Sequence, residues 1–94
     1  MGEAPEFEWD EANQGHIARH RVTPEEFEQA INNDPILVAE YEIKREWRAH
    51  VAGITDQGRL LELVYTVRRG RIRAVTAYPL KRNKKELYRG QFED

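Results

Sequence analysis

The sequence predicts an α+β domain in which helices pack on one face of an antiparallel meander sheet. Two early segments carry helix-capping signals, and four later segments are rich in β-branched and aromatic residues with short turns between them. A last segment, after a proline, again suits a helix. The expected order is therefore β-α-α-β-β-β-β-α, in one domain over residues 1–94 with a flexible start at residues 1–6.

Two helix starts follow a short aromatic strand candidate, "FEWD". Asp10 is a good N-cap for a helix over about residues 11–20. Thr23 is a second N-cap, with Pro24 at the first helical position and Glu26 three residues after the cap. This pattern is a capping box, so we expect a well-defined second helix.

The strand candidates are "ILVAEYEI", "EWRAHVAGIT", "LLELVYTV" and "RIRAVTAY", and glycine-containing turns separate the last three. Consecutive short turns predict an antiparallel meander. Strict alternation in the last strand puts two sets of residues on opposite faces, with the arginines pointing to solvent. One set is Arg71, Arg73, Val75 and Ala77, and the other is Ile72, Ala74, Thr76 and Tyr78. The final helix, "LKRNKKELYRG", is expected to end at Gly90.

Charge is unevenly distributed along a chain whose formal net charge is -2. Residues 1–34 hold nine acidic and two basic residues, whereas residues 68–89 hold nine basic residues and one acidic residue. We expect the arginines of the last strand and the lysines of the final helix to meet on one concave surface that faces a polyanion. The alternative is that the acidic and basic ends lie against each other and neutralise one another.

Composition excludes several classes of protein. The chain is 39% hydrophobic and 34% charged, which fits neither a disordered chain nor a membrane protein. No apolar run approaches the roughly 20 residues that span a bilayer, and the acidic start does not look like a signal peptide. Cysteine is absent, so there are no disulfides and no thiolate metal sites. We expect a soluble cytoplasmic protein without a cofactor.

Two sets of motifs occur in a fixed order along the chain. The first set is a Trp-Asp pair, a short helix ending at His20, and "VTPEE". The second set is Gly53, a Gly-Arg turn and the strand that begins "GRIR". Over roughly residues 7–89, these motifs together resemble the BrnT family of toxins. Many members carry Ser-Ala-Arg at the end of the last strand, where this chain has Thr-Ala-Tyr, ending at Tyr78. The resemblance implies a RelE-like fold, RNA cleavage and neutralisation by an antitoxin, for which a ribbon-helix-helix protein is the candidate.

Metal-independent RNA cleavage needs a base for the 2′-OH, an acid for the leaving 5′-oxygen and cations for the phosphorane. Arg48, Arg73 and Lys81 are the candidates for stabilising the phosphorane, and Arg48 also matches a strand arginine of the resembling family. The candidates for moving protons are Tyr78, Tyr88 and His20. The candidates for binding the RNA backbone are Arg71, Arg73, Lys81, Arg82, Lys84 and Lys85.

Simpler interpretations remain open for each group. The i, i+4 spacing of His16 and His20 suits a metal pair without an evident third ligand, but His20 also suits a helix C-terminus. Arg48 also suits a surface pair with Glu46 or Glu62, and Tyr88 also suits helix packing. The whole chain could instead be a catalytically silent nucleic-acid-binding domain or a protein-interaction module with a basic face.

Overall fold

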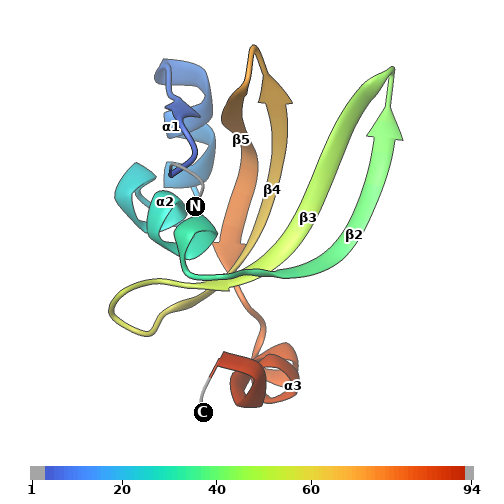
Figure 1. Cartoon of the computed structure of the whole chain (residues 1–94). Helices are drawn as coiled ribbons and strands as arrows, with labels where there is room; N and C mark the ends of the chain where they lie inside the picture. The colour runs from blue at the N-terminus through green and yellow to red at the C-terminus, as the bar shows by residue number, and fades with distance from the viewer. Residues whose placement is uncertain (1–3, 93–94) are drawn as a thin grey trace.

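The computed structural model describes residues 4–92 and has the mixed α+β character expected from the sequence (Figure 1). The expected flexible start falls partly on residues 1–3, which lie outside the described residues. The elements in chain order are β1 (Phe7–Glu8), α1 (Glu11–Ala18), α2 (Pro24–Asn32), β2 (Ile36–Ile43), β3 (Glu46–Ile54), β4 (Leu60–Arg68), β5 (Arg71–Pro79) and α3 (Arg82–Phe92).

The sheet has five strands in the order β1-β5-β4-β3-β2. Strands β2 to β5 pair antiparallel with their chain neighbours, which confirms the predicted meander. The short β1 joins the far edge in parallel with β5, and the carbonyl of Glu6 accepts a hydrogen bond from the N–H of Ile72 at 2.8 Å. Strand β2 therefore forms one free edge of the sheet, and β1 forms the other.

Both predicted helix starts are present. The Asp10 and Thr23 side chains each accept a hydrogen bond from the third helical residue, and both caps are closed as capping boxes. Helix α1 ends at Ala18 rather than at residue 20, because a turn at Arg21 with φ of 61° redirects the chain. Helix α3 runs past Gly90 to Phe92, so the expected stop at that glycine is wrong.

The main core lies between the sheet and the pair α1 and α2. Ile17 and Phe27 are fully buried there against Leu61 and Leu63 of β4. The rings of Trp9 and Phe27 pack edge to face, with centroids 5.6 Å apart. We call this side of the sheet the helix face.

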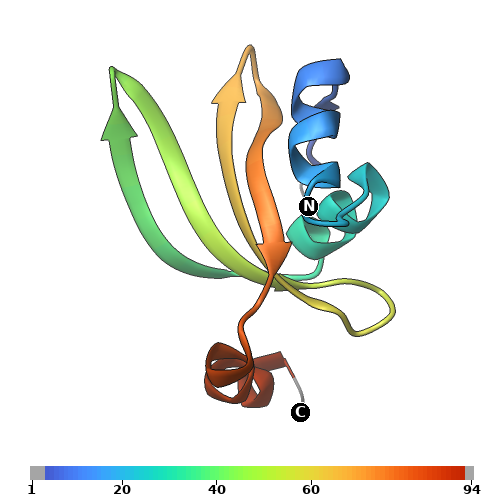
Figure 2. The ribbon, with the colours of Figure 1, turned by 180° about the vertical axis from the view of Figure 1, so that it is seen from behind.

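Helix α3 packs on the opposite side of the sheet, so the prediction that all helices lie on one face is wrong. A second cluster joins Leu80, Tyr88 and Phe92 to Ala52 and Leu60, whose strand neighbours point into the main core. Figures 1 and 2 show α3 well apart from α1 and α2. We call this side the α3 face. Packing of α3 here places the basic C-terminal helix on the polar side of the meander.

A bulge in β5 changes the predicted faces of its second half. Val64 pairs with Thr76 but Tyr65 pairs with Ala74, so Val75 is an extra residue in β5. Ala77 consequently lies in the main core, whereas strict alternation had placed it with the arginines. The bulge also changes the face of Tyr78, which pairs with Glu62 and so lies on the same α3 face as Arg73. The predicted separation of Tyr78 from the arginines is therefore wrong.

Among the described residues, the large hydrophobic side chains that are exposed lie on the β2–β3 hairpin and at the adjoining end of β4. They are Leu37, Val38, Tyr41, Ile43, Trp47 and Val67. Among the described residues, no helix has the length and apolar character needed to cross a membrane.

Candidate active site

A buried carboxylate lies in the middle of the α3 face. Glu62 is only 2% exposed, because β4 is covered on both sides at this level. Its Oε1 atom lies 3.0 Å from His50 Nε2 on β3 and accepts a hydrogen bond from Lys84 Nζ on α3 at 3.1 Å. Within the described part of the chain, its Oε2 atom has no hydrogen-bond partner. We call Glu62, His50, Lys84 and Tyr78 the carboxylate cluster.

The contact with Glu62 fixes the chemistry of His50. A carboxylate can only accept, so Nε2 of His50 carries the proton, and a neutral ring then has its lone pair on Nδ1. The His50 side chain is 20% exposed, so it is accessible from the α3 face. The residue pair therefore supplies an oriented base at the surface of the sheet.

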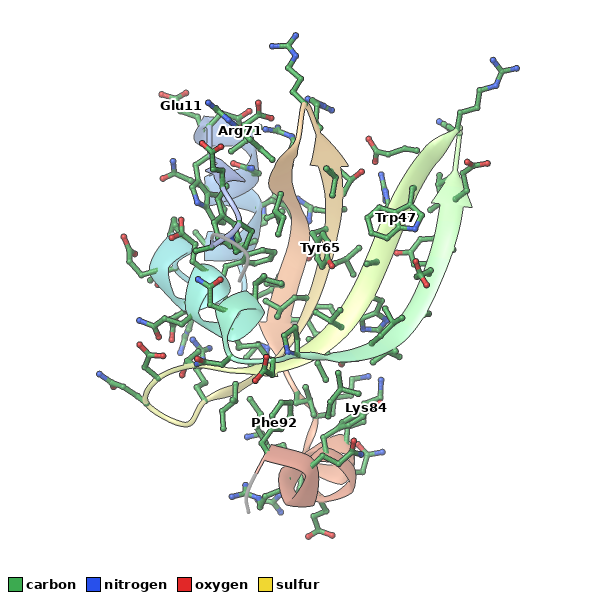
Figure 3. The ribbon with its side chains drawn as sticks, in the orientation of Figure 1. Glu11, Trp47, Tyr65, Arg71, Lys84 and Phe92 are labelled. Atoms are coloured by element: carbon green, nitrogen blue, oxygen red, sulfur yellow. The ribbon has the colours of Figure 1, made fainter. Side chains whose placement is uncertain are left out.

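Tyr78 and Lys84 are both held in their protonated forms at neutral pH. Burial, and then the negative charge of Glu62, raises the pKa of Tyr78 above its ordinary value of 10.0. The hydrogen bond to Glu62 raises the pKa of Lys84 above 10.5. Lys84 points up toward the sheet from α3 (Figure 3). Both side chains therefore act as proton donors or hydrogen-bond donors rather than as bases.

His20 lies against Tyr78 at the boundary between α1 and β5. Their ring centroids are 5.9 Å apart with the planes tilted by 60°. The His20 side chain is exposed, at the turn that follows α1. The structure thus brings together two of the predicted proton-transfer residues, and the contact extends the carboxylate cluster to the α1 side of the sheet.

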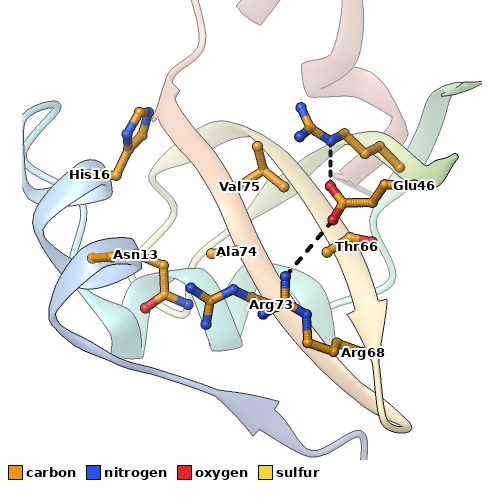
Figure 4. A pocket seen from close by; sticks show the side chains of 10 residues that line it. Asn13, His16, Glu46, Thr66, Arg68, Arg73, Ala74 and Val75 are labelled. Atoms are coloured by element: carbon orange, nitrogen blue, oxygen red, sulfur yellow. Dashed lines mark hydrogen bonds and ion pairs between the residues drawn. The ribbon is translucent and has the colours of Figure 1, made fainter. Parts of the chain in front are cut away.

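Arg48 belongs to a neighbouring cavity of about 260 Å³ on the same face of the sheet. This cavity, which we call the arginine pocket, lies between α1 and the strands, and its ionisable lining residues are Arg48, Arg68, Arg73, Glu46 and His16 (Figure 4). Arg48 Nε donates to Glu46 at 2.9 Å, which is the ion pair considered from the sequence. Arg48 nevertheless lies only two residues from His50 on β3.

Arg73 does not point to solvent as expected. Its side chain is 16% exposed and contacts two carboxylates, Asp10 at 2.8 Å and Glu8 at 3.2 Å. The hydrogen bond to Asp10 is the main reason that the pKa of Arg73 lies above its ordinary value. Arg73 therefore fastens β1 and the start of α1 to β5, and its charge is already neutralised.

The expected single basic surface is divided in two. Arg71 lies at the β4–β5 turn, whereas α3 follows the other end of β5, eight residues or about 26 Å away. Figure 3 shows Arg71 and Lys84 at opposite ends of the sheet. Lys81 and Arg82 are exposed at the start of α3, and Lys85 is half-buried. Tyr88 packs on the second cluster, in line with the packing interpretation.

Sequence reasoning missed the centre of this arrangement. Glu62 entered only as one possible partner of Arg48, and Lys84 only as a backbone-binding residue. One signal was present: a lone carboxylate within the apolar run "LLELV" requires a buried partner. Among residues 4–92, no group of three or more His, Asp or Glu residues is placed to hold a metal ion, and His16 and His20 gain no third ligand.

Comparison with known proteins gives one match. A family model described as "Ribonuclease toxin, BrnT, of type II toxin-antitoxin system" matches residues 9–86. No curated protein and no solved structure matches significantly. The matched range includes β3, β4 and β5 and the start of α3, so it contains every member of the carboxylate cluster.

Proposed function

Because the chain belongs to the BrnT family of ribonuclease toxins of type II toxin-antitoxin systems, we propose that it cleaves RNA at the carboxylate cluster without a metal ion. The observation that carries the proposal is the contact of the buried Glu62 carboxylate with both His50 and Lys84, beside Tyr78. These groups supply a base, a cation and proton donors within one side of the sheet.

In the proposed reaction, His50 Nδ1 takes the proton of a ribose 2′-OH. The 2′-oxygen then attacks the adjacent phosphorus and forms a pentacoordinate phosphorane. The bond to the 5′-oxygen breaks, and Tyr78 or Lys84 gives that oxygen a proton. The products are a 2′,3′-cyclic phosphate and a 5′-hydroxyl. Tyr78 and Lys84 both have raised pKa values, so each carries the proton that a general acid must donate.

Cations around the cluster stabilise the charge that develops on the phosphorane. Lys84 donates a hydrogen bond to Glu62, and Arg48 lies two residues from His50 along β3. Exposed Lys81 and Arg82 at the start of α3 bind the RNA backbone further along. His20 supports Tyr78 through ring contact. Arg73 and Tyr88 hold structural positions, so we assign them no catalytic part.

The test is cleavage of a short RNA by the pure protein in the presence of EDTA. His50→Gln and Tyr78→Phe should each slow single-turnover cleavage by at least about tenfold. Loss of a general acid or base typically slows a reaction by about 100-fold or more, so this threshold is a minimum. Tyr65→Phe is the matched control, because Tyr65 lies on the helix face of the same strand pair. Circular dichroism confirms that each variant is folded.

The alternative outcomes identify the other candidate functions. RNA binding without cleavage would make the chain a catalytically silent nucleic-acid-binding domain. Cleavage that EDTA abolishes would overturn the metal-independent mechanism while leaving the ribonuclease assignment intact. Absence of RNA binding would favour a protein-interaction module with a basic helix.

We further propose that the partner is a ribbon-helix-helix antitoxin and that the fold is a variant of the RelE-like arrangement. The family description supports an antitoxin but not its type. The meander with two N-terminal helices supports the fold proposal. Co-expression with the neighbouring reading frame is the test: rescue of growth by a small ribbon-helix-helix protein supports the partner, and rescue by a different fold overturns it.

A further inference from the structure

The arginine pocket has no part in proton transfer, yet it lies on the same face as the carboxylate cluster. Arg48 and His50 are two residues apart on β3 and point the same way, which separates their Cα atoms by about 7 Å. This is the order of one nucleotide step along an extended backbone. A strand of RNA that crosses His50 therefore has its neighbouring phosphate close to the pocket.

Two arginines in the pocket share a single carboxylate. Oε1 of Glu46 lies 2.9 Å from Arg48 Nε, and Oε2 lies 4.0 Å from Arg68 Nη2. The two oxygens of the carboxylate thus bridge two guanidinium groups from different strands. The two non-bridging oxygens of a phosphodiester have the same charge and can bridge the same pair.

The Glu46 contact is loose enough to be exchanged. The side chain is 35% exposed, and it stands at the first residue of β3, directly after the β2–β3 turn. The more distant pair with Arg68 is at the limit of an ion pair, and Arg68 is 52% exposed. An exposed ion pair of this kind contributes little to stability, so displacing Glu46 costs little.

The third arginine and the threonine of the pocket are committed to contacts within the fold. Arg73 is neutralised by Asp10 and Glu8, so it forms a wall rather than an anion ligand. Thr66 is also engaged, since its hydroxyl donates to the Trp47 carbonyl at 2.7 Å. Arg48 and Arg68 are therefore the pair available to an incoming anion.

We propose that the arginine pocket is a subsite for the RNA phosphate next to the scissile one, and that Glu46 occupies the place of this phosphate in the free protein. The inference rests on the proposed cleavage at the carboxylate cluster. A cavity of 260 Å³ has room for a phosphate group and its ribose, since a water molecule takes about 30 Å³. Substrate binding exchanges the carboxylate for a phosphodiester, and Glu46 turns to solvent.

Binding is measured first, with a short RNA made uncleavable by 2′-deoxyribose at the scissile nucleotide. Arg68→Ala should weaken binding about fivefold and reduce the slope of log affinity against log salt by about 0.7, the share of one contact to a single strand. Glu46→Gln should tighten binding by about threefold, because a competing anion is removed. Arg69→Ala is the control, since Arg69 is an exposed arginine of the β4–β5 turn.

A neutral methylphosphonate then replaces each phosphate of this RNA in turn. The subsite requires one position, next to the scissile link, at which the neutral group weakens binding to the original protein and to Arg69→Ala but not to Arg68→Ala. Equal losses in all three proteins at every position would overturn the subsite.

Cleavage of the matching all-ribose RNA is measured separately, so the two proposals fail independently. Intact cleavage without the Arg68-dependent position leaves the ribonuclease proposal standing and removes the subsite. If the Arg68-dependent position is found but the all-ribose RNA is not cleaved, the phosphate subsite stands and the ribonuclease proposal is removed. Unchanged affinity of Glu46→Gln overturns the competition between the carboxylate and the phosphate.

Discussion

Replacement of Glu62 by leucine should make the protein more stable and less active. The carboxylate is 2% exposed in an apolar strand, and its Oε2 atom has no partner among the described residues. A buried polar atom without a partner costs about 1–3 kcal/mol, and exchanging a buried ion pair for apolar groups is often stabilising. Leucine has a similar size, and Lys84 can return to water because it is 44% exposed. We expect Glu62→Leu to raise the free energy of unfolding by about 1–3 kcal/mol.

The same change removes the anion that orients His50 and Lys84. A hydrogen bond to a charged group contributes about 1.5–3 kcal/mol, which corresponds to about a 10- to 150-fold change in rate. Glu62→Gln keeps the shape of the side chain and should lose this factor in kcat with little change in RNA affinity, since Glu62 does not contact RNA. Glu62→Leu should lose at least as much.

Urea denaturation and single-turnover cleavage on the same preparations check both effects. Glu42→Gln, at an exposed position of β2, is the control for loss of one negative charge. A loss of more than about 2 kcal/mol of stability in Glu62→Leu would refute the reasoning, because mutational losses of that size mark a structural anchor. Unchanged cleavage by Glu62→Gln would equally refute the positioning role.

Three further predictions concern the fold. Gly53→Ala should cost about 1–3 kcal/mol in urea denaturation, because its Cβ would lie 2.8 Å from the Ala30 carbonyl oxygen; a neutral result would mean that α2 can shift. Gly15→Ala should gain about 1 kcal/mol, since the site in α1 is open and alanine favours helix; a loss would contradict that. Burial alone would raise the pKa of Glu26, but the Thr23 N–H and Arg59 outweigh it and leave the pKa below 4.5. Stability from this group is complete above pH 4.5 and is lost as the pH falls through the lower folded value, so the urea midpoint should drop there, and less in Glu26→Gln.

The elements were predictable because their signals are local. The capping boxes at Asp10 and Thr23 and the turn glycines Gly58 and Gly70, both at positive φ, are set by neighbouring residues. The side of the sheet that α3 covers was not predictable in the same way. Leu80, Tyr88 and Phe92 indicate an apolar stripe, but nothing local says which face receives it. The extension of α3 past Gly90 has the same cause, since packing of Phe92 outweighs the helix-ending tendency of glycine.

The sequence identified several residues of the candidate site but not how they are arranged, because the bulge in β5 was not foreseen. His20, Arg48 and Tyr78 were identified by type and position, and they do lie at or beside the carboxylate cluster. Strict alternation nevertheless placed Tyr78 away from Arg73. The period of two holds only while the ladder is regular, and no residue type in "RIRAVTAY" marks a bulge.

The bulge at Val75 is what allows one strand to serve both a core and a site. Before it, Ile72 and Ala74 face the helices; after it, Ala77 does, although it is an odd number of residues further on. If β5 alternated strictly through Val75, Tyr78 would enter the main core, and its hydroxyl would be buried without a partner. The bulge instead pairs Tyr78 with Glu62 on the α3 face and leaves Ala77 in the main core. Deleting Val75 should therefore give a regular β4–β5 ladder in which Ala74 still pairs with Tyr65 and Thr76 still pairs with Val64, so the variant should fold with Ala77 and Tyr78 on their present faces. Urea denaturation checks this prediction, because loss of the cooperative transition in the deletion variant would show that Val75 itself, and not only the register of β5, is needed for folding.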